Sequence, residues 1–329
     1  MIDNQVRIGV IGVGHLGQHH VKHYKTLDNV KLIGVYDIDR ERSSEISKKF
    51  DVKVFDDLNS ILEKVDALSI VTNTEHHYKI AGKCLKSKKH VFIEKPITAM
   101  IEEADKLLSM AEQNKVLIQV GHIERLNPAL LALDKYKVKP KFIEIQRLAP
   151  YTSRGTDVPV VLDKMIHDID IVLSITNSSV KSIRASGLSI LTDSIDIANA
   201  RIRFENGTIA NLTSSRIAKV ELRKVKIFEK NFYATVDLLL GLTEVYKVIK
   251  RTSDAPQAIK IKQFEYNSKK TLIAYEKPEI IIRDSLQMEL LNFIQTIKGE
   301  SEPIVSGKKG KEALAVALDI QKAITQDLH

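Results

Sequence analysis

Short apolar runs alternate with amphipathic stretches through the first third of the chain. The apolar runs, which are rich in β-branched residues, lie at residues 5–11, 30–36, 65–72, 89–93 and 116–120. Between them, apolar positions follow a helical spacing over residues 15–27, 41–50, 76–87 and 99–114. Strands that alternate with helices in this way predict βαβ units, and uniformly apolar strands predict a parallel sheet buried on both faces. We expect a doubly wound parallel α/β domain over residues 1–122.

The pattern changes after residue 122, where strands begin to follow one another. Residues 142–147 alternate as a strand does, a helix is expected near 160–175, and strand-like runs fill about 180 to 280. Turn signals within that region are Ser186-Gly187, Glu205-Asn206-Gly207 and Lys230-Asn231. We therefore expect a second α/β domain over residues 123–329, with a large, mostly antiparallel open sheet.

Helical segments also flank the predicted antiparallel region. Pro128 and Pro140 bound one helical stretch, and two more helices close the chain. The first of the two begins after Asp284, a suitable N-cap, and the second follows Ser306-Gly307. These last helices are expected to pack back on the first domain.

Composition narrows the function classes. Among 329 residues, 43% are apolar and 28% charged, and no apolar run approaches the length of a membrane span, so we expect no membrane insertion. The net charge of +8 comes from lysines scattered among acidic residues, which favours attraction of an anionic ligand over nucleic-acid binding. Cys84 is the single cysteine and no cleavable leader is seen, so we expect a cytoplasmic protein.

A glycine motif follows the first strand. Gly12-Val13-Gly14-His15-Leu16-Gly17 has the G-x-G-x-x-G form, in which the glycines allow a tight turn, approach of a pyrophosphate and close helix packing. Asp37 ends the second strand about 20 residues farther on, where a carboxylate accepts hydrogen bonds from ribose hydroxyls. The motif predicts NAD as cofactor. Arg40 and Arg42 follow closely and leave NADP as an alternative.

Lys95 stands at the end of another predicted strand, in the run Glu94-Lys95-Pro96. Proline ends the strand, so the lysine amine is placed at the carboxyl edge of the sheet, where ligands of α/β proteins bind. His15, His19 and His23, with His20 beside them, have a helical spacing that a metal could use, but no cysteine or carboxylate cluster accompanies them. We interpret these histidines as solvated and expect no metal site.

A carboxylate and an imidazole are paired in the second region. Asp163 and His167 are four residues apart on a predicted helix, and Asp170 is placed on the same face. A carboxylate beside an imidazole raises its basicity, which suits a general base. The alternative is a surface pair on the helix. A nearby nicotinamide site favours catalysis.

Taken in order, the glycine motif, Glu94-Lys95-Pro96 and Asp163-x-x-x-His167 resemble the Gfo/Idh/MocA oxidoreductase family. Thr72-Asn73-x-x-x-His77 resembles its Thr-Pro-x-x-x-His segment, with asparagine in place of proline. The resemblance implies a Rossmann domain, an open sheet that mediates homodimers or homotetramers, and hydride transfer to or from sugars. It assigns Thr72, Asn73, His77, Glu94 and Lys95 to cofactor binding.

The resemblance also assigns catalytic and substrate-binding roles. Lys95 would contact the substrate hydroxyl and the nicotinamide ribose, and His167 would take the hydroxyl proton. Asp163 would orient His167 or bind an adjacent hydroxyl, although either Lys95 or His167 could be the base. Further substrate-binding residues are Arg125, Asn127 and Arg154, in segments that resemble the branch oxidising UDP-N-acetylglucosamine at C3 in lipid A assembly. Arginines suit a diphosphate, but they could equally make local pairs. The alternatives are a dehydrogenase or reductase of a free sugar, inositol or another carbonyl compound, and a non-catalytic NAD-binding regulator.

Overall fold

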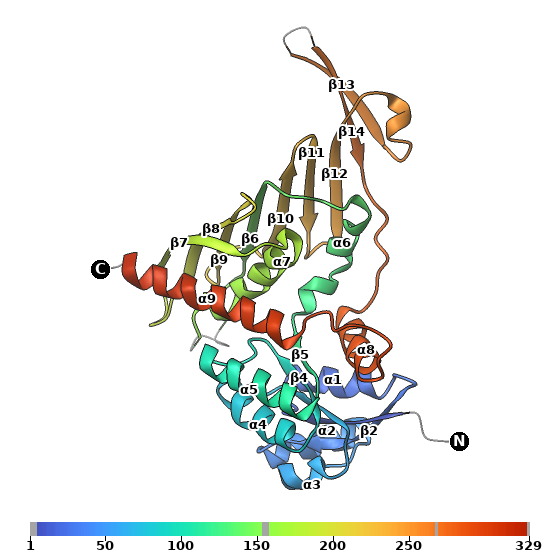
Figure 1. Cartoon of the computed structure of the whole chain (residues 1–329), viewed down its shortest axis with the longest axis vertical. Helices are drawn as coiled ribbons and strands as arrows, with labels where there is room; N and C mark the ends of the chain where they lie inside the picture. Colours follow the sequence, from blue (N-terminus) through green and yellow to red (C-terminus); the bar gives the residue numbers. More distant parts are fainter. Residues whose placement is uncertain (1–4, 153–157, 267–268, 328–329) are drawn as a thin grey trace. The chain divides into compact units, whose positions relative to one another are not determined.

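The computed structural model describes residues 5–152, 158–266 and 269–327, and its backbone is coloured along the sequence in Figure 1. Internal contacts divide the chain into two units. The first unit comprises the residues up to Ile123 together with Asp284–Ala315. The second comprises Glu124–Arg283 together with the residues from Val316 onward.

Within the described residues, the first unit is built on a five-stranded sheet of order β2-β1-β3-β4-β5. Its strands are β1 (Val6–Ile11), β2 (Val30–Tyr36), β3 (Ala67–Ile70), β4 (His90–Glu94) and β5 (Ile118–Gly121). All neighbouring strands are parallel, and β3 and β5 are buried throughout. The predicted doubly wound parallel sheet is therefore confirmed. The chain reverses its direction of winding at β1, so the carboxyl ends of β1 and β3 border the crevice in which such sheets bind ligands.

Helices cover this sheet. They are α1 (Gly17–Tyr24), α2 (Arg40–Phe50), α3 (Leu58–Leu62), α4 (Thr74–Lys86), α5 (Ile101–Asn114), α8 (Ser285–Ile297) and the start of α9 (Gly307–Asp327). The side chain of Asp284 accepts a hydrogen bond from the Gln287 amide, which confirms the predicted cap of α8. α8 joins the core through Phe293, whose ring lies 5.8 Å from that of Phe92. The short α3 was not predicted, although Asp57 caps it.

A nine-stranded sheet forms the second unit in the described part of the chain, with order β13-β14-β12-β11-β10-β6-β9-β8-β7 (Figure 1). Its strands are β6 (Phe142–Leu148), β7 (Val180–Leu188), β8 (Ile197–Phe204), β9 (Ile209–Ser215), β10 (Leu222–Glu229), β11 (Phe232–Asp237), β12 (Leu242–Ile249), β13 (Lys260–Tyr266) and β14 (Lys269–Glu276). The β6–β9 pair is parallel and the other pairs are antiparallel. The predicted mostly antiparallel sheet is confirmed.

The two faces of this sheet differ. One face is apolar and buried, and α7 (Ile166–Thr176) packs against β6 and β9 on it. The opposite face carries a row of partly exposed rings that crosses five strands, formed by Phe142, Phe228, Tyr233, Tyr246 and Tyr275, with neighbouring ring centroids 4.8–5.7 Å apart. We call this set the aromatic row.

Two of the three predicted turns are confirmed. Gly207 lies in the β8–β9 hairpin with φ of 84°, and Asn231 turns between β10 and β11 with φ of 64°. The turn predicted at Ser186-Gly187 is wrong, because β7 continues to Leu188. A Cβ at Gly187 would stand 2.9 Å from the Ile195 side chain, so this glycine permits close packing instead of a turn.

The helix predicted between Pro128 and Pro140 is also largely wrong. Only α6 (Pro128–Leu131) and a 3-10 turn (Asp134–Tyr136) form there. Lys137 then adopts φ of 48°, a left-handed conformation that ends helical structure.

Candidate functional site

The glycine motif forms the turn between β1 and α1. A Cβ at Gly12, where φ is 83°, would lie 2.6 Å from the carbonyl oxygen of Val71, and a Cβ at Gly17 would lie 2.0 Å from that of Gly12. The fold itself therefore requires both glycines. Gly14 differs, because a Cβ there would meet no atom within 4 Å. The open space beside its backbone is what the approach of a pyrophosphate needs.

Asp37 follows β2 and supports this turn directly. Its Oδ2 accepts a hydrogen bond from the Val13 amide at 2.8 Å, and its Oδ1 accepts one from the Asp39 amide at 3.0 Å. Arg42 lies 3.8 Å from the same carboxylate. A carboxylate has about four acceptor positions, so two remain for hydroxyl donors such as those of a ribose.

A pocket of about 410 Å³ opens at this crevice, a size within the range of small-molecule sites. Its lining includes the predicted cofactor residues Gly12, Gly14, Asp37, Thr72 and Asn73. These residues come from the ends of β1, β2 and β3, as expected for a dinucleotide at a doubly wound sheet.

Basic side chains also line the pocket, and the sequence reasoning missed those on α4. His76, Lys79 and Lys83 lie on one face of α4, and Arg42 lies at the start of α2. Their spacing along α4, at i, i+3 and i+7, was the available signal. Together they favour an anionic ligand. The predicted residues His15 and Leu16 are exposed at the turn before α1.

His77 is buried and braces two turns. Its Nδ1 lies 2.9 Å from the carbonyl oxygen of Pro96, and its Nε2 lies 3.0 Å from that of Thr72. Burial lowers the pKa of His77, and a neutral imidazole donates to only one of these carbonyls. The ring therefore ties the segment after β3 to the turn that carries Lys95. Direct contact between His77 and a cofactor stays a prediction.

The side chains of Glu94 and Lys95 have different surroundings. The Glu94 carboxylate lies 3.2 Å from Nε2 of the buried His20 and accepts a 3.3 Å hydrogen bond from the Lys95 amide. A Cβ at Gly121 would lie 2.7 Å from the same carboxylate, so Glu94 is packed inward. Lys95 itself is half-buried at the carboxyl edge of β4, and its peptide bond to Pro96 is cis. The predicted strand end at this lysine is confirmed.

The interpretation of the α1 histidines as solvated is half wrong. His15 and His19 are exposed, but His20 is fully buried, where its Nδ1 lies 3.3 Å from the Ser69 hydroxyl. His23 is 8% exposed, and burial lowers its pKa. Burial follows from the packing of α1 against the sheet and α8, which the i, i+4 spacing alone does not reveal. No group of three His, Cys, Asp or Glu in the described ranges is placed to hold a metal ion.

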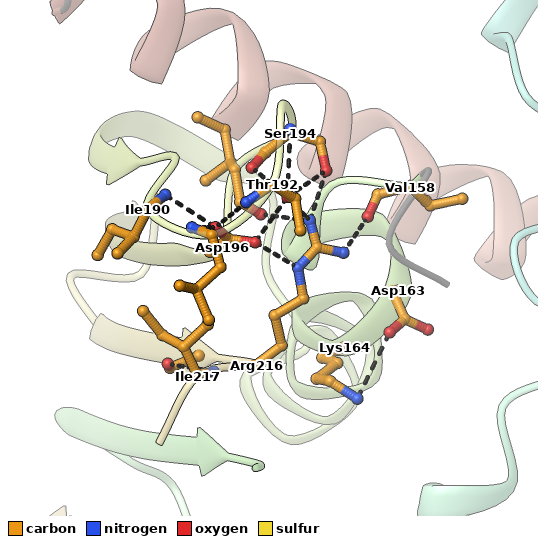
Figure 2. Close-up of polar contacts among 12 residues, drawn as sticks. Val158, Asp163, Lys164, Ile190, Thr192, Ser194, Asp196, Arg216 and Ile217 are labelled. Atoms are coloured by element: carbon orange, nitrogen blue, oxygen red, sulfur yellow. Dashed lines mark hydrogen bonds and ion pairs between the residues drawn. The ribbon is translucent and has the colours of Figure 1, made fainter. Parts of the chain in front are cut away.

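Asp163 and His167 lie in the second unit, at a change of helix type. Residues Val161–Met165 form a π-helix, which is rare and often found at functional sites, and α7 continues from Ile166. The Asp163 carboxylate lies 3.4 Å from the Lys164 ammonium (Figure 2), and both are partly exposed. His167 is partly exposed as well, whereas its neighbours Ile166 and Asp168 are buried.

Buried ion pairs fix the first turns of α7. Asp168 accepts a 2.9 Å hydrogen bond from Nε of Arg147, which also donates to Glu124 at 2.8 Å. Asp170, which the sequence placed on the same helix face as Asp163 and His167, binds Arg125 through two hydrogen bonds of 2.6 Å. These pairs were missed, although Arg147 stands at a buried position of an alternating strand.

Besides Lys95, Asp163 and His167, three further residues were predicted to bind the substrate, and their placements differ. Arg125 is engaged with Asp170, as described above. Asn127 caps α6 by accepting from the Ala129 amide at 3.1 Å and donates to the Leu238 carbonyl at 3.0 Å. Arg154 lies outside the described residues. The roles of Arg125 and Asn127 toward a substrate stay predictions. No helix in the described part of the chain is both long and apolar enough to cross a membrane.

Known proteins resemble the chain over its length. Residues 6–122 match the oxidoreductase family with an NAD-binding Rossmann fold, and residues 141–229 match the GFO/IDH/MocA C-terminal domain. UDP-N-acetylglucosamine 3-dehydrogenase of Acidithiobacillus ferrooxidans is 34% identical over 97% of both chains. A solved structure of that enzyme has a TM-score of 0.89 and covers 100% of both chains. Myo-inositol 2-dehydrogenase of Thermotoga maritima is 27% identical over 98% of this chain and 97% of its own. The chain therefore belongs to the Gfo/Idh/MocA family of nicotinamide-dependent oxidoreductases, which act on CH–OH groups.

Proposed function

We propose that the protein is an NAD-dependent dehydrogenase that oxidises the C3 hydroxyl of UDP-N-acetylglucosamine to a ketone. The observation that carries this proposal is the 34% identity to UDP-N-acetylglucosamine 3-dehydrogenase over 97% of both chains. Lys95, Asp163 and His167 are all present, and a non-catalytic regulator would have no need of a general base. The pathway we propose is lipid A assembly.

The preference for NAD rests on the surroundings of Asp37. Its carboxylate borders the pocket and would repel the 2′-phosphate of NADP. Arg42, the residue best placed to receive that phosphate, already lies near two carboxylates, 3.8 Å from Asp37 and 3.2 Å from Asp39. Because these two carboxylates already neutralise the charge of Arg42, we propose that NAD is the cofactor.

The proposed chemistry separates a hydride from a proton. A nicotinamide held at the glycine turn would supply the acceptor for the hydride that leaves the carbon carrying the hydroxyl. His167 would take the hydroxyl proton as general base, and Asp163 would orient the imidazole and stabilise its protonated form. Lys95 would hold the substrate oxygen through its ammonium, and in its neutral amine form it is the second candidate for the base. The products are then a ketone, the reduced cofactor and one proton.

A screen of substrates with the purified protein tests the proposal. NAD or NADP is mixed with UDP-N-acetylglucosamine, free hexoses or myo-inositol, and formation of the reduced cofactor is followed by absorbance. We expect turnover with UDP-N-acetylglucosamine and NAD. Turnover confined to myo-inositol or a free sugar would reject the sugar-nucleotide substrate and favour the second candidate, suggested by the similarity to myo-inositol 2-dehydrogenase.

We also propose a homodimer or homotetramer formed through the open face of the nine-stranded sheet. The aromatic row on this face is only partly covered, and Phe228 within it is 36% exposed. Aromatic residues are enriched in the cores of protein interfaces. Light scattering on the wild type and on Tyr233→Glu tests this, and a monomeric wild type would reject it.

A further inference from the structure

A buried ion pair lies beside the segment that leads to Asp163. Arg216 directly follows β9 and is 3% exposed, and Asp196 directly precedes β8 and is 0% exposed. Nε of Arg216 donates to Oδ1 of Asp196 at 2.8 Å. Figure 2 shows the two side chains facing each other, with Thr192, Ser194 and the Val158 carbonyl around them. We call this pair the clamp.

The carboxylate of Asp196 binds backbone amides of the loop before β8. Its Oδ2 accepts hydrogen bonds from the amides of Ile190, Leu191 and Thr192 at 2.8, 2.6 and 3.0 Å. Burial alone would raise the pKa of Asp196, but these hydrogen bonds and that of Arg216 outweigh it and hold the pKa well below its usual range. Asp196 is therefore ionised and holds the loop in one conformation.

The guanidinium of Arg216 donates hydrogen bonds to two further backbone segments. Nη1 of Arg216 donates to the carbonyl oxygen of Val158 at 2.7 Å, and Nη2 donates to that of Ile195 at 3.3 Å. The Val160 amide donates to the same Ile195 carbonyl at 3.0 Å. Because a guanidinium is planar and rigid, it fixes the direction as well as the position of these carbonyls.

The segment fixed in this way runs directly into the π-helix Val161–Met165, which carries Asp163. Farther along the same helical stretch, the first turns of α7 are held by the pairs of Asp168 with Arg147 and of Asp170 with Arg125. Asp163 and His167 thus lie between two sets of buried ion pairs. Such pairs contribute little net stability, because desolvation offsets their attraction, and in some proteins they specify one conformation.

We propose that Arg216 is a positioning residue for the reaction: by fixing the carbonyl of Val158, its guanidinium sets the place of Asp163 beside the general base. This inference rests on the proposed function. Arg216 acts only through Asp163 and does not touch the substrate. A misplacement of about 1 Å in an active site can lower turnover about 100-fold, so a disturbed clamp should be detectable as a lower kcat.

Arg216→Lys tests the proposal, because lysine keeps the charge but cannot reproduce the planar fork. We expect the variant to bind NAD within about twofold of the wild type and to lose about 10- to 100-fold in kcat. A double-mutant cycle with Asp163→Asn identifies the route of the effect. If Arg216 acts through Asp163, the double variant is no slower than Asp163→Asn alone. A kcat unchanged in Arg216→Lys, or losses that multiply in the double variant, would overturn the proposal.

Glu276→Gln is the matched control. Glu276 is a buried carboxylate of the same unit, 2.6 Å from the ammonium of Lys247 and 2.8 Å from the hydroxyl of Tyr136. It lies on β14, five strand positions from β9 in the sheet, or about 24 Å at about 4.8 Å per strand. The control should lower the melting temperature and leave kcat within about twofold. An equal loss of kcat in the control would show that Arg216→Lys acts only through general stability, and the proposal would fail.

Hydrogen exchange separates this inference from the proposed function. If the wild type oxidises none of the substrates tested, the proposed function fails, and amide exchange over residues 159–167 then decides on the clamp. Faster exchange there in Arg216→Lys, and not in Glu276→Gln, would support it. Exchange equal to that of the wild type would overturn it.

Discussion

Gly14→Ala separates the requirements of the fold from those of the cofactor. A Cβ at Gly14 would meet no protein atom within 4 Å, and the φ angle of this residue is not positive. Alanine therefore fits the folded protein as it stands. Gly12 and Gly17 offer no such test, because a Cβ at either position would collide with backbone oxygen atoms.

The expected magnitudes follow from these contacts. Alanine at an unstrained position restricts the unfolded chain and stabilises the protein by about 0.4–1 kcal/mol. The added methyl group occupies space that the pyrophosphate needs. The pyrophosphate should therefore lose at least one hydrogen bond from the protein, and a hydrogen bond to a charged group contributes about 1.5–3 kcal/mol. NAD should therefore bind about 10- to 100-fold more weakly, while the melting temperature stays equal or rises.

Isothermal titration calorimetry with NAD and thermal unfolding without it measure the two effects. Gly82→Ala, in α4 of the same unit, is the control, because its added Cβ would meet side chains no closer than 3.9 Å. That variant should gain stability and bind NAD normally. An unchanged Kd in Gly14→Ala would refute the placement of the pyrophosphate at this turn, and a large fall in its melting temperature would refute the steric reasoning.

Three further predictions concern catalysis, pH and the buried charges. Lys95→Ala should lower turnover by more than about 100-fold while NAD binding largely survives, since the ammonium is proposed to hold the reacting substrate oxygen and to be one of many contacts to the cofactor; equal rates would contradict that role. Burial lowers the pKa of His90, whose Nδ1 accepts a 3.0 Å hydrogen bond from the Leu117 amide, so the folded protein binds fewer protons than the unfolded chain. Its stability contribution is complete above about pH 6.5 and declines as the pH falls, so thermal unfolding from pH 8 to 5.5 should show a smaller decline in His90→Gln than in the wild type. Asp168→Ala removes one carboxylate partner of Arg147 and leaves it with Glu124, so it should cost about 1.5–3 kcal/mol in urea unfolding, and a loss under about 1 kcal/mol would contradict this account.

Local patterns were sufficient for the element order and for much of the cofactor site. The strand predicted at residues 30–36 matches β2 at both ends, and Asp37 follows it beside the glycine turn. The Asn206-Gly207 hairpin and the Asp284 cap were likewise predictable, because turn and cap preferences depend on a few neighbouring residues. Placing Lys95 at a strand end needed only the apolar run and the proline that follows it.

The sequence by itself thus determined the alternation of strands and helices, the glycine turn and the residue types available for hydride transfer. Only the tertiary structure decided that His20 is buried, that a π-helix carries Asp163, and that Arg216 meets Asp196. The physical reason is that periodicity tells which face of an element is apolar but not which distant side chain lies opposite a buried charge. Such a charge is stable only with its partner in place, and that partner is brought to it by the fold.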